Sequence, residues 1–353
     1  MPNSIITASG SYIPTVRVPN DHFLRHTFYD EGGVHSKTSN ADTIEKFREI
    51  TCIEERRYVT DDLNTSDIAF LAAEQALQET DRETLDYIIV GHNLGDVKAA
   101  NELCDMVPTL AARVKHRLGI RNPYTVAYDI PFGCPGWLHG MILADYYIKS
   151  GDAGKILVIG AETLSRISDP HDRDSMIYSD GAGAVLVEAT ERQGGILSHV
   201  TRSDTFQEAY LLWMDRSYHP GFTDSRLFLK MKGHEVYKYA VRTVPDVVRR
   251  SLEKAGLTLA DVKKVLIHQA NQKMDEAILR RLFRSYGIEK IPDHIMPMTI
   301  SWLGNSSVAT LPTLYDLLQR GKLDNHGLQA GDVVVFASVG AGMNVNSMVY
   351  RVP

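Results

Sequence analysis

Three polar residues lie where a buried strand gives way to a helix, and their types can support nucleophilic catalysis. Cys134 follows a strand-like run that ends near Ile130, His268 closes the apolar run Val265-Leu-Ile, and Asn305 precedes a helical stripe of leucines. In α/β folds such strand ends face the ligand crevice. A lone residue of each type is more often a packed cysteine, a hydrogen-bonded core histidine or a capping asparagine. Three such junctions in one chain favour a shared active site.

Cys134 is the candidate nucleophile because the start of a helix favours the thiolate through its free N–H groups and macrodipole. Pro135 fits the first helical turn, where no hydrogen-bond donor is lost. The chain has three cysteines, an odd number at wide spacing, which argues against a disulfide framework and against a zinc ribbon. On this segment alone, a reactive cysteine and a merely packed one both remain open.

The elements that position these residues alternate between apolar runs and amphipathic stretches, which indicates α/β construction. No linker rich in Pro, Gly or Ser divides the chain, so we expect two intimately packed halves, residues 1–193 with the cysteine and residues 194–353 with His268 and Asn305. Residues 20–48 are expected to be an irregular surface excursion. The predicted helices cover residues 68–76, 138–146, 236–252 and 311–318, and the predicted strands cover residues 85–91, 124–130, 156–160, 265–268 and 332–337.

Composition excludes several classes of protein. The chain has 353 residues, 44% of them hydrophobic, and a net charge of -6 without long runs of like charge, so nucleic acid is not expected as a partner. No apolar stretch approaches the ~20 residues of a membrane span, and no export signal opens the sequence, so a cytoplasmic location is expected. His234-Glu235 lacks the second histidine of a zinc helix, and no phosphate-binding glycine loop is present, so neither a metal nor a cofactor is expected.

From Ile5 to Arg351 the chain resembles the ketoacyl-acyl-carrier-protein synthase III (FabH-like) group of the thiolase-like condensing enzymes. The resemblance implies an α/β, thiolase-like five-layered α-β-α-β-α fold of two similar halves, assembled as a homodimer. It rests on the cysteine segment together with Asp180-Gly-Ala-Gly-Ala184, His268-Gln-Ala-Asn271, Gly304-Asn-Ser-Ser307 and Gly340-Ala-Gly342.

The resemblance also implies a mechanism for an acyltransferase. Cys134 would take an acyl group from a thioester, and a malonyl- or 3-oxoacyl thioester would then supply the carbon nucleophile of a Claisen-type condensation. His268 and Asn305 would donate hydrogen bonds to the enolate oxygen. The backbone N–H groups of Cys134 and Ala341 would form the oxyanion hole. Such enzymes serve fatty acid or polyketide synthesis.

Two departures from the family pattern concern the substrate. Lys46 and Ile50 stand where priming enzymes hold the adenine of coenzyme A with Trp and Arg, although Arg173 matches another adenine-side residue. The acyl donor is therefore expected to be a thioester of acyl carrier protein more than of CoA. The long excursion suggests the DarB-type branch, which makes dialkylresorcinol or cyclohexanedione precursors. Four basic residues match the family's carrier-docking patch, although a solvated helix face explains each equally well: Lys238, Lys273, Arg280 and Arg281.

Other classes of protein share part of this pattern of residues. The glycine-rich segment Gly340-Ala-Gly342 has no second cysteine, which favours condensation over thiolysis, and Asn305 replaces the second histidine of elongating relatives. A papain-type cysteine hydrolase has the same residue order, but its cysteine lies near a mature N-terminus. A non-catalytic acyl-binding partner is the third possibility, and such proteins commonly lose one of the three residues.

Overall fold

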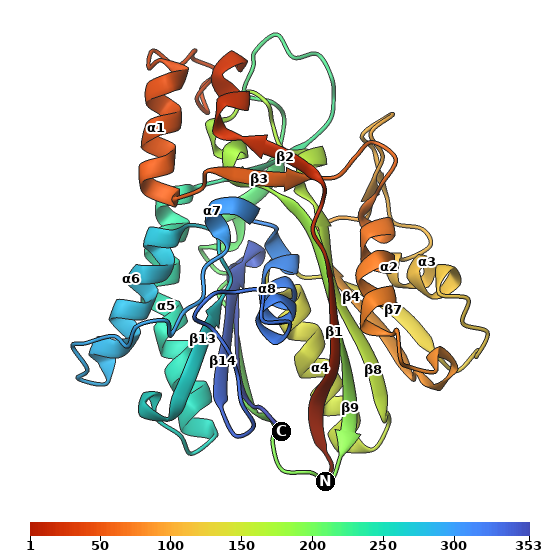
Figure 1. Cartoon of the computed structure of the whole chain (residues 1–353). Coiled ribbons are helices and arrows are strands. Elements are labelled where there is room, and N and C mark those ends of the chain that lie inside the picture. Colours follow the sequence, from red (N-terminus) through yellow and green to blue (C-terminus); the bar gives the residue numbers. More distant parts are fainter.

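Two β-sheets form the frame of the protein in a computed structural model that describes residues 1–353 (Figure 1). The first sheet has five strands in the order β1 (Asn3–Tyr12), β9 (Asp180–Thr190), β8 (Lys155–Thr163), β4 (Tyr87–His92) and β7 (Val126–Pro131). The second has four strands in the order β10 (Gly195–Ser203), β15 (Asn344–Arg351), β14 (Val333–Gly340) and β13 (Val262–Ile267). All strands of the first sheet therefore precede residues 191–194 in the sequence, and all strands of the second sheet follow them.

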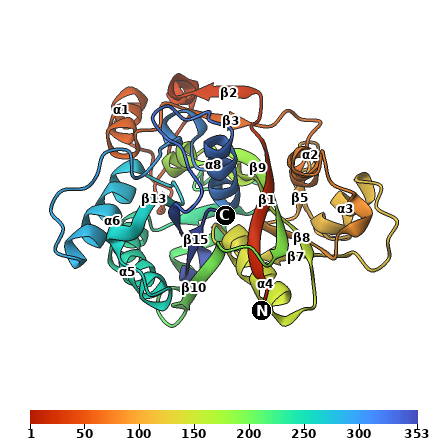
Figure 2. The same cartoon turned by 60° about the horizontal axis from the view of Figure 1, so that its bottom comes forward.

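Three helical layers alternate with the two sheets (Figures 1 and 2). Helices α2 (Thr65–Ala76) and α3 (Leu110–Arg117) cover the outer face of the first sheet. Helices α4 (Gly136–Ser150) and α8 (Thr310–Gln319) lie between the sheets, and α5 (Gly233–Lys254) and α6 (Gln272–Ser285) cover the outer face of the second. This is the expected five-layered α-β-α-β-α arrangement.

The central layer holds the two sheets together. Leu138 and Met141 of α4 and Leu314 of α8 belong to one buried apolar cluster with Ile89 of the first sheet and Phe336 of the second. A helix between two sheets is apolar on nearly all sides, which explains why both sequences lack a polar face. Each fully buried side chain of this size contributes about 1.5–3 kcal/mol relative to its exposed state.

The two halves share an order of elements. Helix α4 precedes β8, which runs parallel to β4 and antiparallel to β9. Helix α8 precedes β14, which runs parallel to β13 and antiparallel to β15. The starts of the two helices also meet, because a Cβ atom on Gly136 would lie 3.3 Å from Val308 Cγ2. The residues just before α4 and α8 therefore occupy equivalent places around one centre.

Part of the predicted irregular excursion is helical, so that expectation was wrong for residues 20–25 and 40–48. Residues 20–25 form a short 3-10 helix and α1 spans Asn40–Thr51. The side chain of Ser39 caps α1 by accepting a hydrogen bond from the Asp42 N–H at 3.1 Å, and Ile44 and Phe47 bury its inner face. The smaller elements are β2 (Val16–Pro19), β3 (Glu55–Tyr58), β5 (Asp96–Val97), β6 (Cys104–Asp105), β11 (Leu212–Asp215), β12 (Phe228–Met231) and α7 (Ile300–Leu303).

The other predicted elements agree with the structure within a few residues. Helix α4 ends before Gly151, which adopts a left-handed conformation at φ 82° as a helix C-terminus requires. Helix α5 contains Pro245, as expected. None of the helices combines the length and the apolar character needed to cross a membrane.

Candidate active site

Cys134 lies in the tight turn between β7 and α4. Gly133 has φ 67°, a value that L side chains rarely adopt, and α4 begins two residues after the cysteine. The end of β14 closes over this turn, because a Cβ atom on Gly340 would lie 2.9 Å from the Cys134 N atom. A side chain at either glycine would displace the cysteine.

Burial raises the pKa of the Cys134 thiol to about 11, and the negative charge of Glu162 adds to this effect. A hydrogen bond from Ser307 opposes it, as does the positive end of the α4 macrodipole. At neutral pH the resting residue is therefore mainly a thiol. The helix start favours the thiolate, as expected from the sequence, but burial outweighs this effect in the resting residue.

Ser307 lies among the three residues that the sequence singled out, and it is hydrogen-bonded to two of them. Its hydroxyl donates to Cys134 Sγ at 3.2 Å, and its N–H donates to Asn305 Oδ1 at 2.8 Å. The main chain of Ser307 also acts on His268, because it raises the pKa of the imidazole against the larger effect of burial. Three side chains from distant parts of the sequence are thus brought together around one residue.

His268 directly follows β13 and is 2% exposed. Its N–H donates to the Ala337 carbonyl of β14 at 2.9 Å, which fixes the main chain at the strand end. The Nδ1 atom has no hydrogen-bond partner. Burial lowers the pKa of His268 to about 4, so the imidazole is neutral at pH 7 and can accept a proton.

Asn305 is held by the main chain on both sides. Its N–H donates to the Ile177 carbonyl at 3.0 Å, and its own carbonyl accepts from the Ser179 N–H at 2.9 Å. Gly304 precedes it with φ 65° and ψ -163°, and a Cβ atom there would lie 2.8 Å from Arg56 Cβ. Because the Asn305 Oδ1 atom accepts from Ser307, its amide Nδ2 remains available as a donor.

Ala341 is the first residue after β14. Its backbone N atom lies close to the cysteine turn, since a Cβ atom on Gly133 would be 3.2 Å from it. The side chain of Asn344 donates to the Ala341 carbonyl at 2.9 Å and holds this turn in place. The structure therefore places the Ala341 backbone beside the Cys134 turn.

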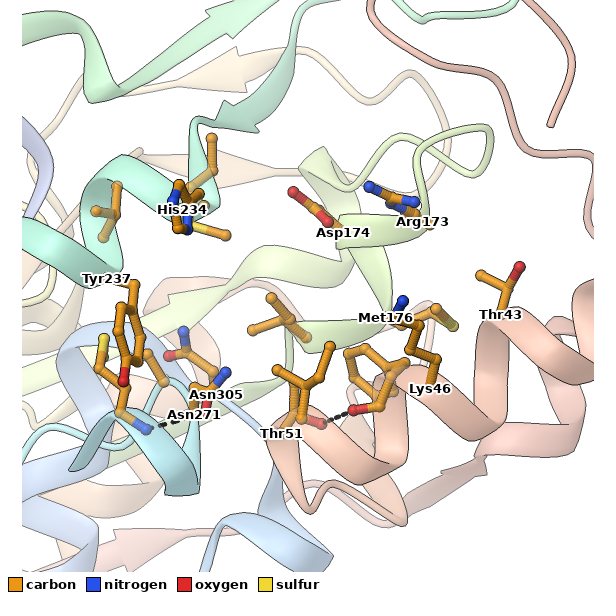
Figure 3. A pocket seen from close by; sticks show the side chains of 18 of the residues that line it. Thr43, Lys46, Thr51, Arg173, Asp174, Met176, His234, Tyr237, Asn271 and Asn305 are labelled. Carbon is orange, nitrogen blue, oxygen red and sulfur yellow. Dashed lines mark hydrogen bonds between the residues drawn. The ribbon is translucent and has the colours of Figure 1, made fainter. Parts of the chain in front are cut away.

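A cavity of about 640 Å³ leads from the surface to Asn305, between α1, α5 and α6 (Figure 3). Figure 3 shows Asn305 and Asn271 on one side and Thr43, Lys46 and Arg173 on the other. Nine of its 20 lining residues are hydrophobic, so it can accept a partly apolar arm. The apolar ones include Phe47, Ile50, Met176, Met231, Val236 and Met274.

The mouth of the cavity carries both signs of charge. Lys46 and Ile50, the two residues that replace the family's adenine-binding pair, both line it, and so do Arg173 and Asp174. Burial raises the pKa of Asp174 to about 6, with a further contribution from the neighbouring Asp172. Asp174 is therefore mostly ionised at pH 7.

The four predicted docking residues lie on the adjacent helices α5 and α6, and two of them pair with their own helix. Lys238 Nζ is 3.0 Å from Glu235, and Arg280 is 3.7 Å from Glu276. Lys273 and Arg281 are exposed without such a pair. Exposed pairs of this kind are weak, so all four remain able to meet an anionic partner.

Sequence reasoning missed four residues next to this centre: Asn93, Glu162, Tyr178 and Ser307. Glu162 and Asn93 stand at the ends of β8 and β4, the same kind of strand end that drew attention to His268. Tyr178 is 3% exposed and its hydroxyl has no hydrogen-bond partner. Burial raises its pKa well above the usual value, with smaller contributions from Asp174, Asp172 and Cys134. No group of three or more His, Cys, Asp or Glu side chains is arranged to hold a metal ion.

Comparisons with known proteins place these features in a family. Residues 128–205 match 3-oxoacyl-[acyl-carrier-protein (ACP)] synthase III, and residues 252–352 match its C-terminal region. The beta-ketoacyl-[acyl-carrier-protein] synthase III of Xanthomonas campestris pv. campestris is 31% identical over 354 residues, covering 99% of this chain and 98% of that protein.

Solved structures give the same result. The 3-oxoacyl-[acyl-carrier-protein] synthase III of Aquifex aeolicus superposes with a TM-score of 0.80 at 30% identity and covers 99% of both chains. A priming beta-ketosynthase from a polyketide biosynthetic pathway superposes with a TM-score of 0.80 at 25% identity, over 100% of this chain and 97% of that one.

Proposed function

Because the chain belongs to the 3-oxoacyl-[acyl-carrier-protein] synthase III family, and is thus a condensing acyltransferase of the thiolase-like fold, we propose that Cys134, His268 and Asn305 perform its Claisen condensation. The single observation that carries this assignment is that Ser307 is hydrogen-bonded to Cys134 and Asn305 while its main chain raises the pKa of His268. Each side chain has the chemistry that one step requires: a sulfur nucleophile, a neutral imidazole and an amide donor.

In the first step the Cys134 sulfur attacks the carbonyl carbon of an acyl thioester. The neutral imidazole of His268 accepts the thiol proton and returns it to the leaving thiol, so charge is balanced over the exchange. The N–H groups of Cys134 and Ala341 would stabilise the oxyanion of the tetrahedral intermediate. One thioester is replaced by another, so the acyl group keeps its reactivity.

In the second step the acceptor forms an enolate. A malonyl-type acceptor would do so by losing carbon dioxide and keeping the electron pair of the broken bond, and a 3-oxoacyl acceptor by giving its acidic α proton to the neutral His268 imidazole. The His268 N–H and the Asn305 Nδ2 donate hydrogen bonds to the enolate oxygen. The enolate carbon then attacks the acyl carbonyl on Cys134 and releases the thiolate. The hydrogen bond from the Ser307 N–H supports this role for Asn305, because it fixes which end of the amide faces the cavity.

The acyl donor is proposed to be a carrier-protein thioester. A phosphopantetheine arm presents one phosphate to the mouth, whereas CoA adds two further phosphates and an adenine. Ile50 offers no charge or hydrogen bond to a nucleotide, and the ionised Asp174 beside Arg173 repels additional phosphate. Exposed Lys238, Lys273, Arg280 and Arg281 of α5 and α6 would attract the acidic surface of the carrier.

The enzyme is proposed to act as a homodimer through the open edge of the first sheet. β7 ends that sheet and has only β4 as a neighbour, which leaves a row of unpaired main-chain groups. Large apolar side chains are exposed on this strand and on the segment leading to α3, at Val126, Leu103, Met106 and Val107. Light scattering at micromolar concentration tests this: a monomer would contradict it.

Membership of the dialkylresorcinol or cyclohexanedione branch is also proposed, with a 3-oxoacyl thioester as the acceptor. The replacement of the family's adenine-binding pair by Lys46 and Ile50 at the mouth of the cavity supports this branch. Product analysis with a defined acyl-carrier-protein donor against malonyl and 3-oxoacyl acceptors decides the matter. A cyclic dione supports the specialised branch, and a simple 3-oxoacyl product from malonyl alone contradicts it.

Intact-mass spectrometry after exposure to an acyl thioester tests the assignment of the nucleophile. We expect one acyl adduct on the wild-type chain and none on Cys134→Ala. A protein that only binds acyl chains would give no adduct, and an adduct that persists in the variant would refute the role of Cys134.

A further inference from the structure

A continuous row of hydrogen bonds connects a buried carboxyl to the sulfur of Cys134. Glu162, at the end of β8, is 1% exposed and accepts from the Asn93 N–H at 2.7 Å and from the Asn93 Nδ2 at 2.5 Å. Asn93 directly follows β4, and its Nδ2 also donates to Ser307 Oγ at 2.8 Å. Ser307 in turn donates to Cys134 Sγ at 3.2 Å.

The row has a fixed direction. Burial raises the pKa of Glu162 to about 7, so above neutral pH the residue is a carboxylate that only accepts. It then fixes both the main chain and the amide of Asn93 with its Nδ2 facing Ser307. The Ser307 oxygen accepts one of the two Nδ2 protons. A hydroxyl has one proton, which is therefore left for the sulfur. Ser307 thus reaches Cys134 as a donor, and a donor favours the anionic form of the group that accepts it.

We propose that Glu162 and Asn93 are positioning residues that aim the Ser307 hydroxyl at the Cys134 sulfur, so that this hydroxyl stabilises the thiolate during acyl transfer. The inference rests on the proposed role of Cys134 as nucleophile and adds three residues to it. Ser307 touches the reacting atom, while Asn93 and Glu162 act through it.

The site needs such a donor because its burial works against ionisation. Burial is the main reason for the raised pKa of Cys134, and the charge of Glu162 raises it further through space. The same carboxylate therefore has two opposing effects, one through its field and one through the hydrogen bonds that it organises. The Ser307 hydroxyl reaches the sulfur directly and Ser307 is itself buried, so the loss of this hydroxyl should be measurable.

The first test is a pH titration of the thiolate absorbance in Ser307→Ala, with alkylation of Cys134 by iodoacetamide alongside. Loss of a hydrogen bond to a charged group is expected to raise the midpoint by about one pH unit. The thiolate fraction at pH 8 then falls about tenfold, but a more basic thiolate is about threefold more nucleophilic, so alkylation should slow about threefold.

Ser306→Ala is the matched control. The Ser306 hydroxyl is buried next door, but its contact is with Thr310 Oγ1 at 3.4 Å and not with the sulfur. We expect its titration midpoint to equal that of the wild type. An unchanged midpoint in Ser307→Ala, or an equal shift in Ser306→Ala, would overturn the inference.

The second test asks whether Asn93 acts through Ser307. Asn93→Ala should raise the midpoint in the same direction, and the double variant Asn93→Ala with Ser307→Ala should show no further rise. Additive shifts would mean that Asn93 only supports the ends of β4 and β8, which would refute the relay. If Ser307→Ala fails to fold, as judged by its melting temperature, the presence or absence of a shift in Asn93→Ala decides.

These titrations involve no acyl substrate, so they separate the two proposals. A shift in Ser307→Ala together with no acyl adduct on wild-type Cys134 would support the relay and refute the nucleophile. An acyl adduct on wild-type Cys134, without any shift of the midpoint in Ser307→Ala, would support the nucleophile and refute the relay.

Discussion

The centre around Ser307 and the mouth of the cavity that leads to Asn305 are built in different ways. At the centre, Asn305 and Ser307 are held by hydrogen bonds to main chain and side chains from both halves of the chain. At the mouth, the side chains of Lys46, Arg173 and Asp174 make no hydrogen bond or ion pair within the protein, although all three line the same space.

Under the proposed function, the centre carries out the chemistry and the mouth recognises the substrate. The groups at the centre sit at strand ends and helix starts, where the sheet frame allows little movement, as transition-state stabilisation requires. The groups at the mouth sit on α1 and on the 3-10 helix Arg173–Ile177, which can change residues without disturbing the sheets. The four predictions below test the comparison.

The largest effect is expected at the centre, where Cys134→Ala removes the proposed nucleophile. Condensation should fall by at least about a thousandfold, because the remaining donors cannot replace a covalent step. Steady-state product formation measures it. Cys104→Ala, a change to an exposed cysteine, should retain wild-type activity. A Cys134 variant that still condenses above about a tenth of the wild-type rate would place the chemistry elsewhere.

Asn305→Ala should split the two half-reactions. Loss of one donor to the enolate is expected to slow condensation about a hundredfold. Acyl loading, measured by intact mass in single turnovers, should change by less than about threefold, because the proposed oxyanion hole of that step uses main-chain N–H groups. An equal loss in both half-reactions would instead mean that the change has disturbed the Cys134 turn.

The burial of the centre should appear in the pH dependence of stability. Because the pKa of folded His268 is about 4, below its usual value of 6.5, the unfolded chain binds a proton first as the pH falls. The contribution of His268 to the free energy of unfolding is therefore present above pH 6.5. It is lost as the pH falls from 6.5 to 4, and the total loss is roughly 3 kcal/mol.

Urea unfolding of the wild type and of His268→Gln, at pH 7 and pH 4.5, isolates this contribution. Between pH 7 and pH 4.5, the free energy of unfolding of the wild type should fall by about 2–3 kcal/mol more than that of the variant. His234→Gln, a change to an exposed histidine of the mouth, is the control and should follow the wild type. Parallel curves for His268→Gln and wild type would show that the imidazole is not sealed from solvent.

The smallest effect is expected at the mouth. Asp174→Asn removes the carboxylate beside Arg173, so the KM for an acyl-CoA donor should fall about fivefold with kcat unchanged. The KM for a carrier-protein donor should change by less than about twofold. A fall in kcat would mean that the mouth takes part in the chemistry, and no change in KM would show that Asp174 does not discriminate between the donors.

Local patterns predicted most of the elements and the strand ends that carry the site. The hydrophobic runs before Cys134 and His268 and the helical stripe after Asn305 needed only the nearest residues to be recognised, since burial and helix periodicity are local properties. Helix α1 was missed although Ser39 and Asp42 form a capping pattern, because many polar residues outweighed the buried Ile44 and Phe47.

The amino-acid sequence by itself determined the alternation of helices and strands, the glycines at the tight turns and the identity of the three candidate catalytic side chains. Only the tertiary structure decided which residues touch them and how they ionise. Asn93 contacts Glu162 across 69 residues and Ser307 across 214, and Ser307 meets Cys134 across 173. The pKa values of Cys134 and His268 are set by burial between two sheets, which is a property of the folded layers and not of any segment.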